Sequence, residues 1–196
     1  CDWSSHVCSS DLTGMFGKWH LGDNYPFRPE DRGFNEVLRH GGGGVGQTPD
    51  YWDNAYFDGA YFHNSKPEPV KGFCTDVFFD AALAWTGKQI EAGKPFFTYI
   101  ALNAPHSPMY APEKNKQRFL AAGFDEKAAA RYGMVENIDE NFGRLERHLE
   151  AVGLRESTLV AFLTDNGSTM GPRYFNAGMK GGKVTLSEGE IGRAHV

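Results

Sequence analysis

The sequence predicts an α/β fold with a mostly parallel, mixed sheet flanked by helices, and three observations support this fold class. An amphipathic helical repeat covers about residues 125–152, and an unbroken apolar run, Thr158–Thr164, follows it. A second apolar run, Pro95–Leu102, follows another helical stretch. Helices that alternate with short apolar strands are typical of a parallel sheet with helices on its faces.

The helix expected near Asp125–Val152 is the clearest element. Its apolar residues recur at steps of three and four, as one face of a helix requires: Met134, Ile138, Phe142, Leu145, Leu149 and Val152. Asp125 can cap the start of this helix, and Gly153 can end it. The run Thr158–Thr164 comes directly after it and has the length of a strand buried on both faces, so helix and strand together form half of a βαβ unit.

The earlier half of the chain repeats this arrangement. A helix is expected from about Thr75 to Ala92, ahead of the strand at Pro95–Leu102. A further short strand is expected to include Met15 and Phe16. Tyr61–Val70 is expected to form a hairpin that turns near Asn64 and Ser65.

Composition excludes some classes of function. The 196 residues are 40% hydrophobic and carry a formal net charge of −5, without long runs of one sign. Such a chain has no broad positive field for nucleic acid, so an anionic substrate must be attracted by local cations. No apolar run reaches the roughly 20 residues that a membrane-spanning helix needs. The three cysteines have neither zinc-site spacing nor an even count for a disulfide framework.

The two ends of the chain differ from the sequence between them. Residues 1–12 show no clean periodicity, and residues 190–196 break a glycine-rich pattern abruptly. We therefore expect both ends to be non-native tails around one domain portion, residues 13–189.

Four short polar segments carry most of the functional information. Each is rich in Gly or Pro and contains Lys, His, Asp or Asn: GKWHLG at 17–22, NAPHSP at 103–108, TDNG at 164–167 and GGK at 181–183. NAPHSP and TDNG follow the carboxyl ends of the two predicted apolar strands. Ligands bind at the carboxyl ends of strands in open α/β sheets, so these segments predict an anion site.

Two adjacent residues offer oxygen ligands. Asp165 and Asn166 provide the hard oxygen atoms that calcium or magnesium prefers, and a turn built from Asp, Asn and Gly is the alternative. A complete site needs more ligands than these two.

The basic side chains suit the handling of an anion and of protons. His106 lies in a loop between Pro105 and Pro108 and could act as a general acid. Lys18 and His20 would point the same way on an extended segment. Lys180 and Lys183 flank a Gly-Gly pair that lets the backbone approach a ligand closely, and either lysine could neutralise a sulfate or phosphate oxygen. Taken one at a time, each could equally be a solvated loop side chain.

In this order, these residues resemble the sulfatase family of the alkaline phosphatase superfamily. The resemblance runs from about Thr13 to Gly189 and is most specific in two blocks, GKWHLG and the segment from the helix at Asn137–Leu154 to TDNG. It is supported by Arg32–Phe34, by NAPHSP and by the GGK segment. The resemblance implies a truncated alkaline phosphatase-like fold, an internal fragment of the catalytic domain.

The resemblance also implies an activity and roles for residues. The activity is calcium-dependent hydrolysis of a sulfate monoester, in which a hydrated formylglycine made from cysteine or serine attacks sulfur. By their match to the family motifs, Asp165 and Asn166 are expected to be calcium ligands. Lys18 corresponds to the lysine that bridges sulfate and nucleophile, and His20 to the histidine that takes up the proton of the hydrate. His106 and Lys183 correspond to sulfate contacts that also assist the departure of the alcohol. Fixed cations and an acid belong there because charge concentrates on the sulfate and leaving oxygens in the transition state.

The sequence departs from the family pattern where the nucleophile should be. The family motif, Cys or Ser followed by x-Pro-Ser-Arg, is absent, because Cys8 leads into Ser-Ser-Asp and Cys74 leads into Thr-Asp. The acidic pair that completes the calcium site is absent as well, and Glu190 stands where the family usually has glycine. We therefore expect the isolated chain to be inactive and to bind calcium weakly.

Two other functions remain open from the sequence. One is a phosphodiesterase or phosphonate hydrolase of the same superfamily. The other is a noncatalytic glycan-binding module that uses the aromatic residues between Tyr51 and Phe62. The expected substrate is a small-molecule or glycan sulfate ester, and the resemblance implies a periplasmic or extracellular location.

Overall fold

The computed structural model describes residues 11–42, 44–45, 54–191 and 194–195. The chain divides into two compact units, residues 1–148 and 149–196. Most of the expected tail 1–12 lies outside the described residues, and Leu12 is already the first residue of a strand. The division at residues 12 and 190 stays a prediction.

A five-stranded mixed sheet organises the first unit, in the order β4-β3-β2-β1-β5. The central strand β1, Leu12–Lys18, pairs in parallel with β2, Glu36–His40, and with β5, Phe96–Ala101. This confirms the expected strand around Met15 and Phe16 and the mostly parallel α/β class. Strand β1 is buried along its five central residues, as expected for a strand with neighbours on both sides and cover on its faces.

The expected hairpin forms the far edge of this sheet. Strands β3, Ala60–His63, and β4, Lys66–Pro69, pair antiparallel. Asn64 and Ser65 make the turn with φ of 45° and 67°, the left-handed pair of a two-residue hairpin turn. The sheet is mixed because this hairpin joins β2 antiparallel.

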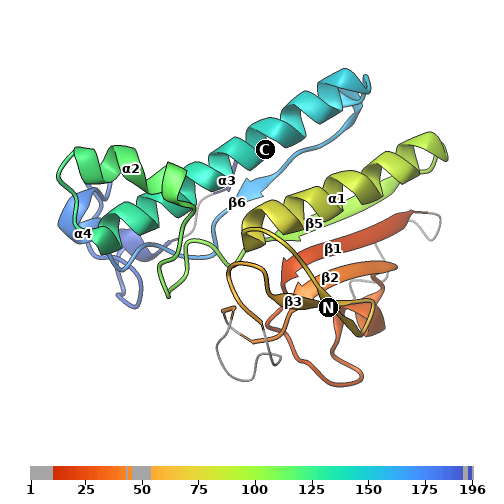
Figure 1. Cartoon of the computed structure of the whole chain (residues 1–196), viewed down its shortest axis with the longest axis horizontal. Helices are drawn as coiled ribbons and strands as arrows, with labels where there is room; N and C mark the ends of the chain where they lie inside the picture. The colour runs from red at the N-terminus through yellow and green to blue at the C-terminus, as the bar shows by residue number, and fades with distance from the viewer. Residues whose placement is uncertain (1–10, 43, 46–53, 192–193, 196) are drawn as a thin grey trace. The chain divides into compact units, whose positions relative to one another are not determined.

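Helix α1, Cys74–Glu91, confirms the helix expected at 75–92 and covers one face of the sheet along β1 and β5 (Figure 1). Its buried face includes Phe78 and Trp85, and their rings lie 5.0 Å from Tyr61 and 6.0 Å from Phe16, measured between centroids. Aromatic pairs at these separations add to the apolar burial that holds a helix on a sheet. This layer is the core of the first unit.

Helix α3, Glu126–Ala151, confirms the long helix expected from the apolar repeat. Asp125 caps it as expected, since its side chain accepts the amide N–H of Ala128 at 2.8 Å. The short helix α2, Glu113–Ala121, precedes α3. Lys114 of α2 pairs with Glu140 of α3 at 2.7 Å, and Arg118 pairs with Glu136 at 2.8 Å.

The strands that follow α1 and α3 are less buried than expected. In β5 the side chains alternate, so that Phe97 and Tyr99 are 39% and 45% exposed. In the second unit only Phe162–Leu163 of the run Thr158–Thr164 forms a strand, β6, and it pairs antiparallel with β7, Ala194–His195. Both residues of β6 are exposed. The expectation of a parallel strand buried on both faces is therefore wrong for β6. Its one described strand partner, β7, is antiparallel, and a partner that pairs along the strand edge covers neither face.

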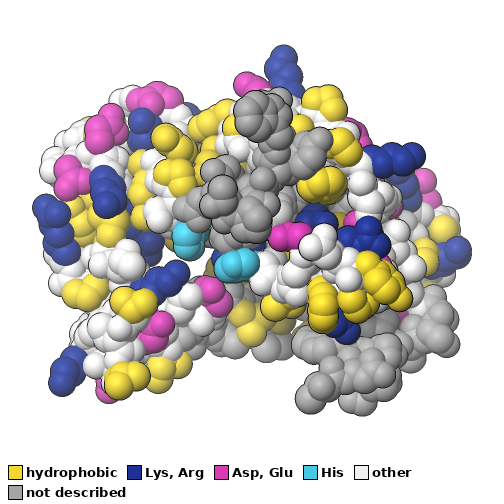
Figure 2. Space-filling view, turned by 90° about the horizontal axis from the view of Figure 1, so that it is seen from below, with side chains coloured by type: hydrophobic (Ala, Val, Ile, Leu, Met, Phe, Trp, Pro, Cys, Tyr) yellow, Lys and Arg dark blue, Asp and Glu magenta, His cyan; other side chains and the backbone are white. Residues whose placement is uncertain are grey.

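The remaining helices of both units are short. They are the 3-10 helices η2, Pro29–Arg32, η3, Arg155–Ser157, and η4, Glu188–Glu190, and the single α turn α4, Gly171–Tyr174. Among the described residues, no helix combines the length and the apolar character that a membrane crossing needs. On the face shown in Figure 2, basic side chains are interspersed with acidic and apolar ones. This mixed surface agrees with the absence of long charge runs in the sequence.

Candidate active site

Three parallel strands end at the same edge of the sheet in the first unit. The register pairs Lys18 with His40 and Gly17 with Ala101. The carboxyl ends of β1, β2 and β5 therefore meet at this edge, and the chain leaves them through the GKWHLG and NAPHSP segments. Lys18, His20 and the loop of His106 consequently follow strands that end at one edge.

Gly17 permits the close approach of β1 and β5 beside Lys18. Its φ is 120°, and a Cβ atom at this position would overlap the backbone carbonyl oxygen of Ala101. Only glycine satisfies both the backbone conformation and the space. The glycine of the GKWHLG motif thus fixes where the strand delivers Lys18.

The segment after β1 is not extended as far as the sequence predicts. The strand ends at Lys18, and His20 has a φ of 55°, in the left-handed region. The indole N–H of Trp19 donates to the carbonyl oxygen of Phe27 at 2.7 Å, and its ring meets Phe34 edge-on. The expectation that Lys18 and His20 share one extended segment is therefore corrected. The loop turns at His20 because Trp19 anchors it.

His40 is a buried residue of this edge that sequence reasoning missed. It is fully buried at the end of β2, and burial lowers its pKa to about 3, with further lowering by the charges of Lys18, Arg39 and His20. The imidazole is therefore neutral at physiological pH. Its position as the last residue of a strand, directly before a glycine run, was the signal that could have identified it.

Arg39 is a second buried basic residue next to His40. Its guanidinium lies 3.2 Å from Asp23 and 5.2 Å from the centroid of the Phe62 ring. A buried cation needs such compensation because desolvation of an unpaired charge is costly. Asp23 lies directly after GKWHLG, so this ion pair ties the loop after β1 to β2.

His106 lies in the loop after β5 and is half-buried. Its Nδ1 atom is 2.8 Å from the carbonyl oxygen of Ser107. A carbonyl oxygen can only accept a hydrogen bond, so Nδ1 carries the proton and Nε2 is left to accept or donate elsewhere. The backbone of the loop is held as well, since the His106 N–H donates to Asn103 at 2.8 Å and the Tyr56 hydroxyl donates to the His106 carbonyl at 3.2 Å.

The second unit holds Asp165, Asn166 and Lys183. Asp165 is exposed, and Asn166 is half-buried in an antiparallel bridge to Ile191. The backbone N–H of Lys183 donates to the carbonyl oxygen of Ser168 at 3.3 Å. The TDNG and GGK segments are therefore backbone neighbours within this unit.

The donor atoms of Asp165 and Asn166 are compatible with calcium in kind but incomplete in number. Calcium takes six to eight oxygen ligands, and these two side chains supply a carboxylate and an amide oxygen. No described residue forms an ion pair with Asp165. Within the described ranges, no three His, Cys, Asp or Glu side chains gather in a way that could hold a metal ion.

The aromatic residues that supported a glycan-binding module belong largely to the core. Tyr56 and Tyr61 are 5% and 0% exposed. Tyr51 and Trp52 lie outside the described residues. Among the described aromatic residues of this stretch, Phe57 is the most exposed, at 43%. Side chains that fill a core cannot stack on a sugar, so this observation argues against the glycan-binding module.

Comparisons with known proteins point to one family. The family model described as Sulfatase matches residues 12–192. An N-acetylgalactosamine-6-sulfatase of Canis lupus familiaris is 31% identical over 91% of this chain and 35% of its own length. A protein described as an uncharacterized sulfatase, YdeN of Escherichia coli (strain K12), is 27% identical over 87% of this chain and 33% of its own length. The chain thus spans about a third of these relatives.

Solved structures share the fold of this chain. The crystal structure of Ps i-CgsB in complex with k-i-k-neocarrahexaose matches with a TM-score of 0.82 and 28% identity, over 94% of this chain and 44% of that protein. The PsFucS1 sulfatase from Pseudoalteromonas sp. matches with a TM-score of 0.69 and 23% identity, over 95% of this chain and 42% of that protein.

Proposed function

The chain belongs to the sulfatase family, and from that premise we propose that the protein containing it hydrolyses a sulfate monoester in a calcium-dependent reaction. The observation that supports the proposal is the common edge at which three parallel strands end, since the segments that carry Lys18, His20 and His106 follow β1 and β5 there. This edge is where an α/β sheet binds its ligand.

The roles of these residues follow from their chemistry. Lys18 binds a sulfate oxygen and neutralises charge beside the nucleophile. His20 holds the proton that the nucleophile gives up. His106 directs Nε2 away from its bond to Ser107, and in its protonated form it can donate to the leaving oxygen. Lys183 contacts the sulfate from the GGK segment.

Asp165 and Asn166 are the proposed calcium ligands. When bound, the ion would stabilise negative charge on the sulfate as a Lewis acid. The isolated chain should bind calcium weakly, because two ligands are fewer than half of the shell that calcium requires. It should also be inactive, because the Cys or Ser of the family's nucleophile motif is not among its residues.

The test compares the isolated chain with the complete protein. The chain alone should release no 4-nitrophenol from 4-nitrophenyl sulfate, while the complete protein should do so and lose activity with a chelator. In the complete protein, Lys18→Ala should lower kcat by about 100- to 1000-fold, as the loss of one charge-stabilising contact does. Lys88→Ala, on the exposed side of α1, is the matched control. Steady turnover by the isolated chain would contradict the inference that the nucleophile is missing from it.

Hydrolysis of a phosphodiester or phosphonate is the alternative within the superfamily. The matched relatives described above are sulfatases, which favours the sulfate ester. Comparing turnover of an aryl sulfate with that of an aryl phosphate diester and an aryl phosphonate by the complete protein separates the two activities. A higher kcat/KM for the phosphate diester or the phosphonate would reject the sulfatase activity.

The substrate class and the location are further parts of this proposal. Two relatives are named for carbohydrates, as an N-acetylgalactosamine-6-sulfatase and an ulvan-active sulfatase. A sulfated glycan is therefore the substrate class that we propose, and the periplasm or the extracellular space is the proposed location. A nucleic-acid partner is not proposed, because the net charge is −5.

A further inference from the structure

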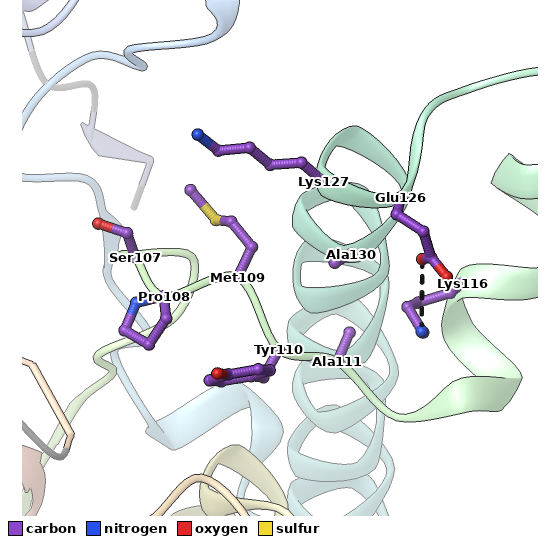
Figure 3. Close-up of a pocket in the computed structure, with 9 residues that line it drawn as sticks. All are labelled: Ser107, Pro108, Met109, Tyr110, Ala111, Lys116, Glu126, Lys127 and Ala130. Atoms are coloured by element: carbon purple, nitrogen blue, oxygen red, sulfur yellow. Dashed lines mark ion pairs between the residues drawn. The ribbon is translucent and has the colours of Figure 1, made fainter.

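A cavity of about 570 Å³ lies in the first unit, immediately after His106 along the chain. One wall is the segment that follows His106 and leads into α2, and the opposite wall is the first turn of α3 (Figure 3). Its volume falls within the range of about 300–1,000 Å³ that is typical of ligand pockets. None of the roles proposed above uses this cavity.

The lining is mostly apolar. Met109, Tyr110, Ala111 and Ala130 contribute to it. Tyr110 is 53% exposed, yet its ring packs edge-on against the buried Tyr56 with centroids 5.4 Å apart. A ring held in this way offers a fixed apolar surface at low entropic cost, as sugar rings require for stacking.

One uncompensated positive charge lies at this cavity. Lys116 pairs with Glu113 at 2.9 Å and with Glu126 at 3.6 Å, so its charge is balanced. Lys127 is exposed and forms no ion pair with any described residue. In Figure 3 its side chain extends from α3 in the direction of Met109 and Ser107, away from the Lys116–Glu126 pair.

The cavity is also linked to the proposed reaction site. Tyr110 contacts Tyr56, and the Tyr56 hydroxyl donates to the carbonyl oxygen of His106 at 3.2 Å. Ser107, which accepts from the His106 ring, lines the cavity itself. The cavity therefore begins at the residue that follows His106 and shares contacts with the loop that holds it.

We propose that this cavity binds a sugar unit adjacent to the reacting one in a sulfated glycan. The C–H face of that sugar packs on Met109 and Tyr110, and its sulfate or carboxylate group pairs with Lys127. An apolar floor with a single free cation selects a ligand that has an apolar face and an anionic group. This assignment rests on the proposed sulfatase function and specifies its substrate as a polyanionic oligosaccharide.

The test measures binding to the chain as it stands, by isothermal titration calorimetry. The probes are a sulfated galactan hexasaccharide and its chemically desulfated counterpart. The sulfated probe should bind more tightly, and Lys127→Gln should weaken its binding by about tenfold while leaving the desulfated probe unchanged, because one charge-assisted contact is lost. Tyr110→Ala should weaken binding of both probes.

Lys88→Gln is the matched control, since Lys88 is an exposed lysine on α1, away from the cavity. Equal weakening by Lys127→Gln and Lys88→Gln, or no binding of the sulfated probe, would overturn the cavity assignment. The outcome is separable from that of the proposed function, because binding requires no turnover. If the complete protein hydrolyses 4-nitrophenyl sulfate but Lys127→Gln binds the probe normally, only the cavity assignment fails. If binding depends on Lys127 but the complete protein hydrolyses no sulfate ester, the proposed function fails.

Discussion

Substitution of Gly17 by alanine tests whether the packing of β1 against β5 delivers Lys18 to the sheet edge. Two separate costs are expected. The first is conformational, since a residue other than glycine at a φ of 120° costs about 1–3 kcal/mol. The second is steric, because the new Cβ would overlap the carbonyl oxygen of Ala101. A backbone atom cannot rotate away as a side chain can, so we expect a further loss of about 1–3 kcal/mol.

Gly72→Ala separates the two costs. Gly72 has a φ of 106°, close to that of Gly17, but a Cβ there would meet nothing nearer than Val77 at 4.0 Å. This variant carries the conformational cost alone. Gly17→Ala should therefore lower the free energy of unfolding by about 1–3 kcal/mol more than Gly72→Ala does.

The assay is urea unfolding of both variants and of the unmodified chain, followed by tryptophan fluorescence and fitted with a common slope. In the complete protein, Gly17→Ala should also lower turnover of 4-nitrophenyl sulfate, since Lys18 is displaced, while Gly72→Ala should not. Equal destabilisation by the two alanines would refute the steric argument. Full turnover by Gly17→Ala would refute the positioning of Lys18 by this contact.

Three further predictions concern stability, pH dependence and reactivity. Asp76→Ala should lower the free energy of unfolding by about 1–3 kcal/mol, because the Asp76 carboxylate accepts hydrogen bonds from the buried side-chain amides of Asn137 at 2.9 Å and Asn141 at 2.6 Å. The control Asp80→Ala, which removes the exposed ion pair with Arg144, should cost under about 1 kcal/mol in the same urea titration. Equal costs for the two variants would contradict the stabilising role of the Asp76 hydrogen bonds. The hydrogen bond to Glu36, aided by Glu68, raises the pKa of His63, so the stabilisation from this histidine is fully present below the unfolded pKa of about 6.5 and is lost as pH rises through the raised folded pKa. The difference in unfolding free energy between the unmodified chain and His63→Gln should therefore shrink as the pH rises above about 6.5. A difference that stays constant with pH would exclude the linkage. Burial raises the pKa of the Cys74 thiol to about 12, so iodoacetamide at about pH 8 should leave Cys74 unmodified in the folded chain and alkylate it in urea. Mass spectrometry of the peptide that contains Cys74 measures the alkylation. Rapid alkylation in the folded chain would contradict the burial of this thiol.

The elements that the sequence predicts well are those whose pattern reflects local geometry. Helix α3 shows its apolar face at steps of three and four, and the Asn64–Ser65 turn adopts the left-handed pair that a two-residue hairpin needs. Strand β2 lacks such a pattern, since it buries Arg39 and His40. Asp23 and Phe62, distant in sequence, compensate the charge of Arg39, and His40 is neutral because its pKa is lowered to about 3. No local pattern reveals that compensation.

Exposure of the apolar strands was mispredicted for a related reason. An unbroken apolar run shows that a segment can be covered on both faces, but the neighbours that cover it are set by the rest of the fold. Phe97 and Tyr99 of β5 pack beside Phe34 with ring centroids 6.3 and 6.4 Å apart and still remain partly exposed. Helix α2 was missed because it is polar, and its ion pairs with α3 involve tertiary partners.

The site was predictable to the extent that it depends on strand order and glycine. GKWHLG and NAPHSP could be assigned to one sheet edge because each follows an apolar strand, and the parallel register of β1 and β5 agrees with this. The left-handed turn at His20 could not be predicted, since it depends on the bond from Trp19 to the distant Phe27 carbonyl. The roles of Lys18, His20, His106, Lys183, Asp165 and Asn166 stay predictions until the variants are assayed.

The net positive charge at the carboxyl edge of the sheet depends more on which basic side chains are buried than on how many there are. Lys18, Arg39 and His40 lie on adjacent strands in a chain with a net charge of −5. Asp23 compensates Arg39, and His40 is held neutral because burial and the neighbouring cations lower its pKa to about 3. A protonated His40 would add a buried charge beside the cations of Lys18 and Arg39, and the desolvation of such a charge is costly. The positive field available to an anion therefore comes from groups nearer the surface, such as Lys18. This reconciles an acidic chain with an anionic substrate, because the attraction is local and begins where the strands end.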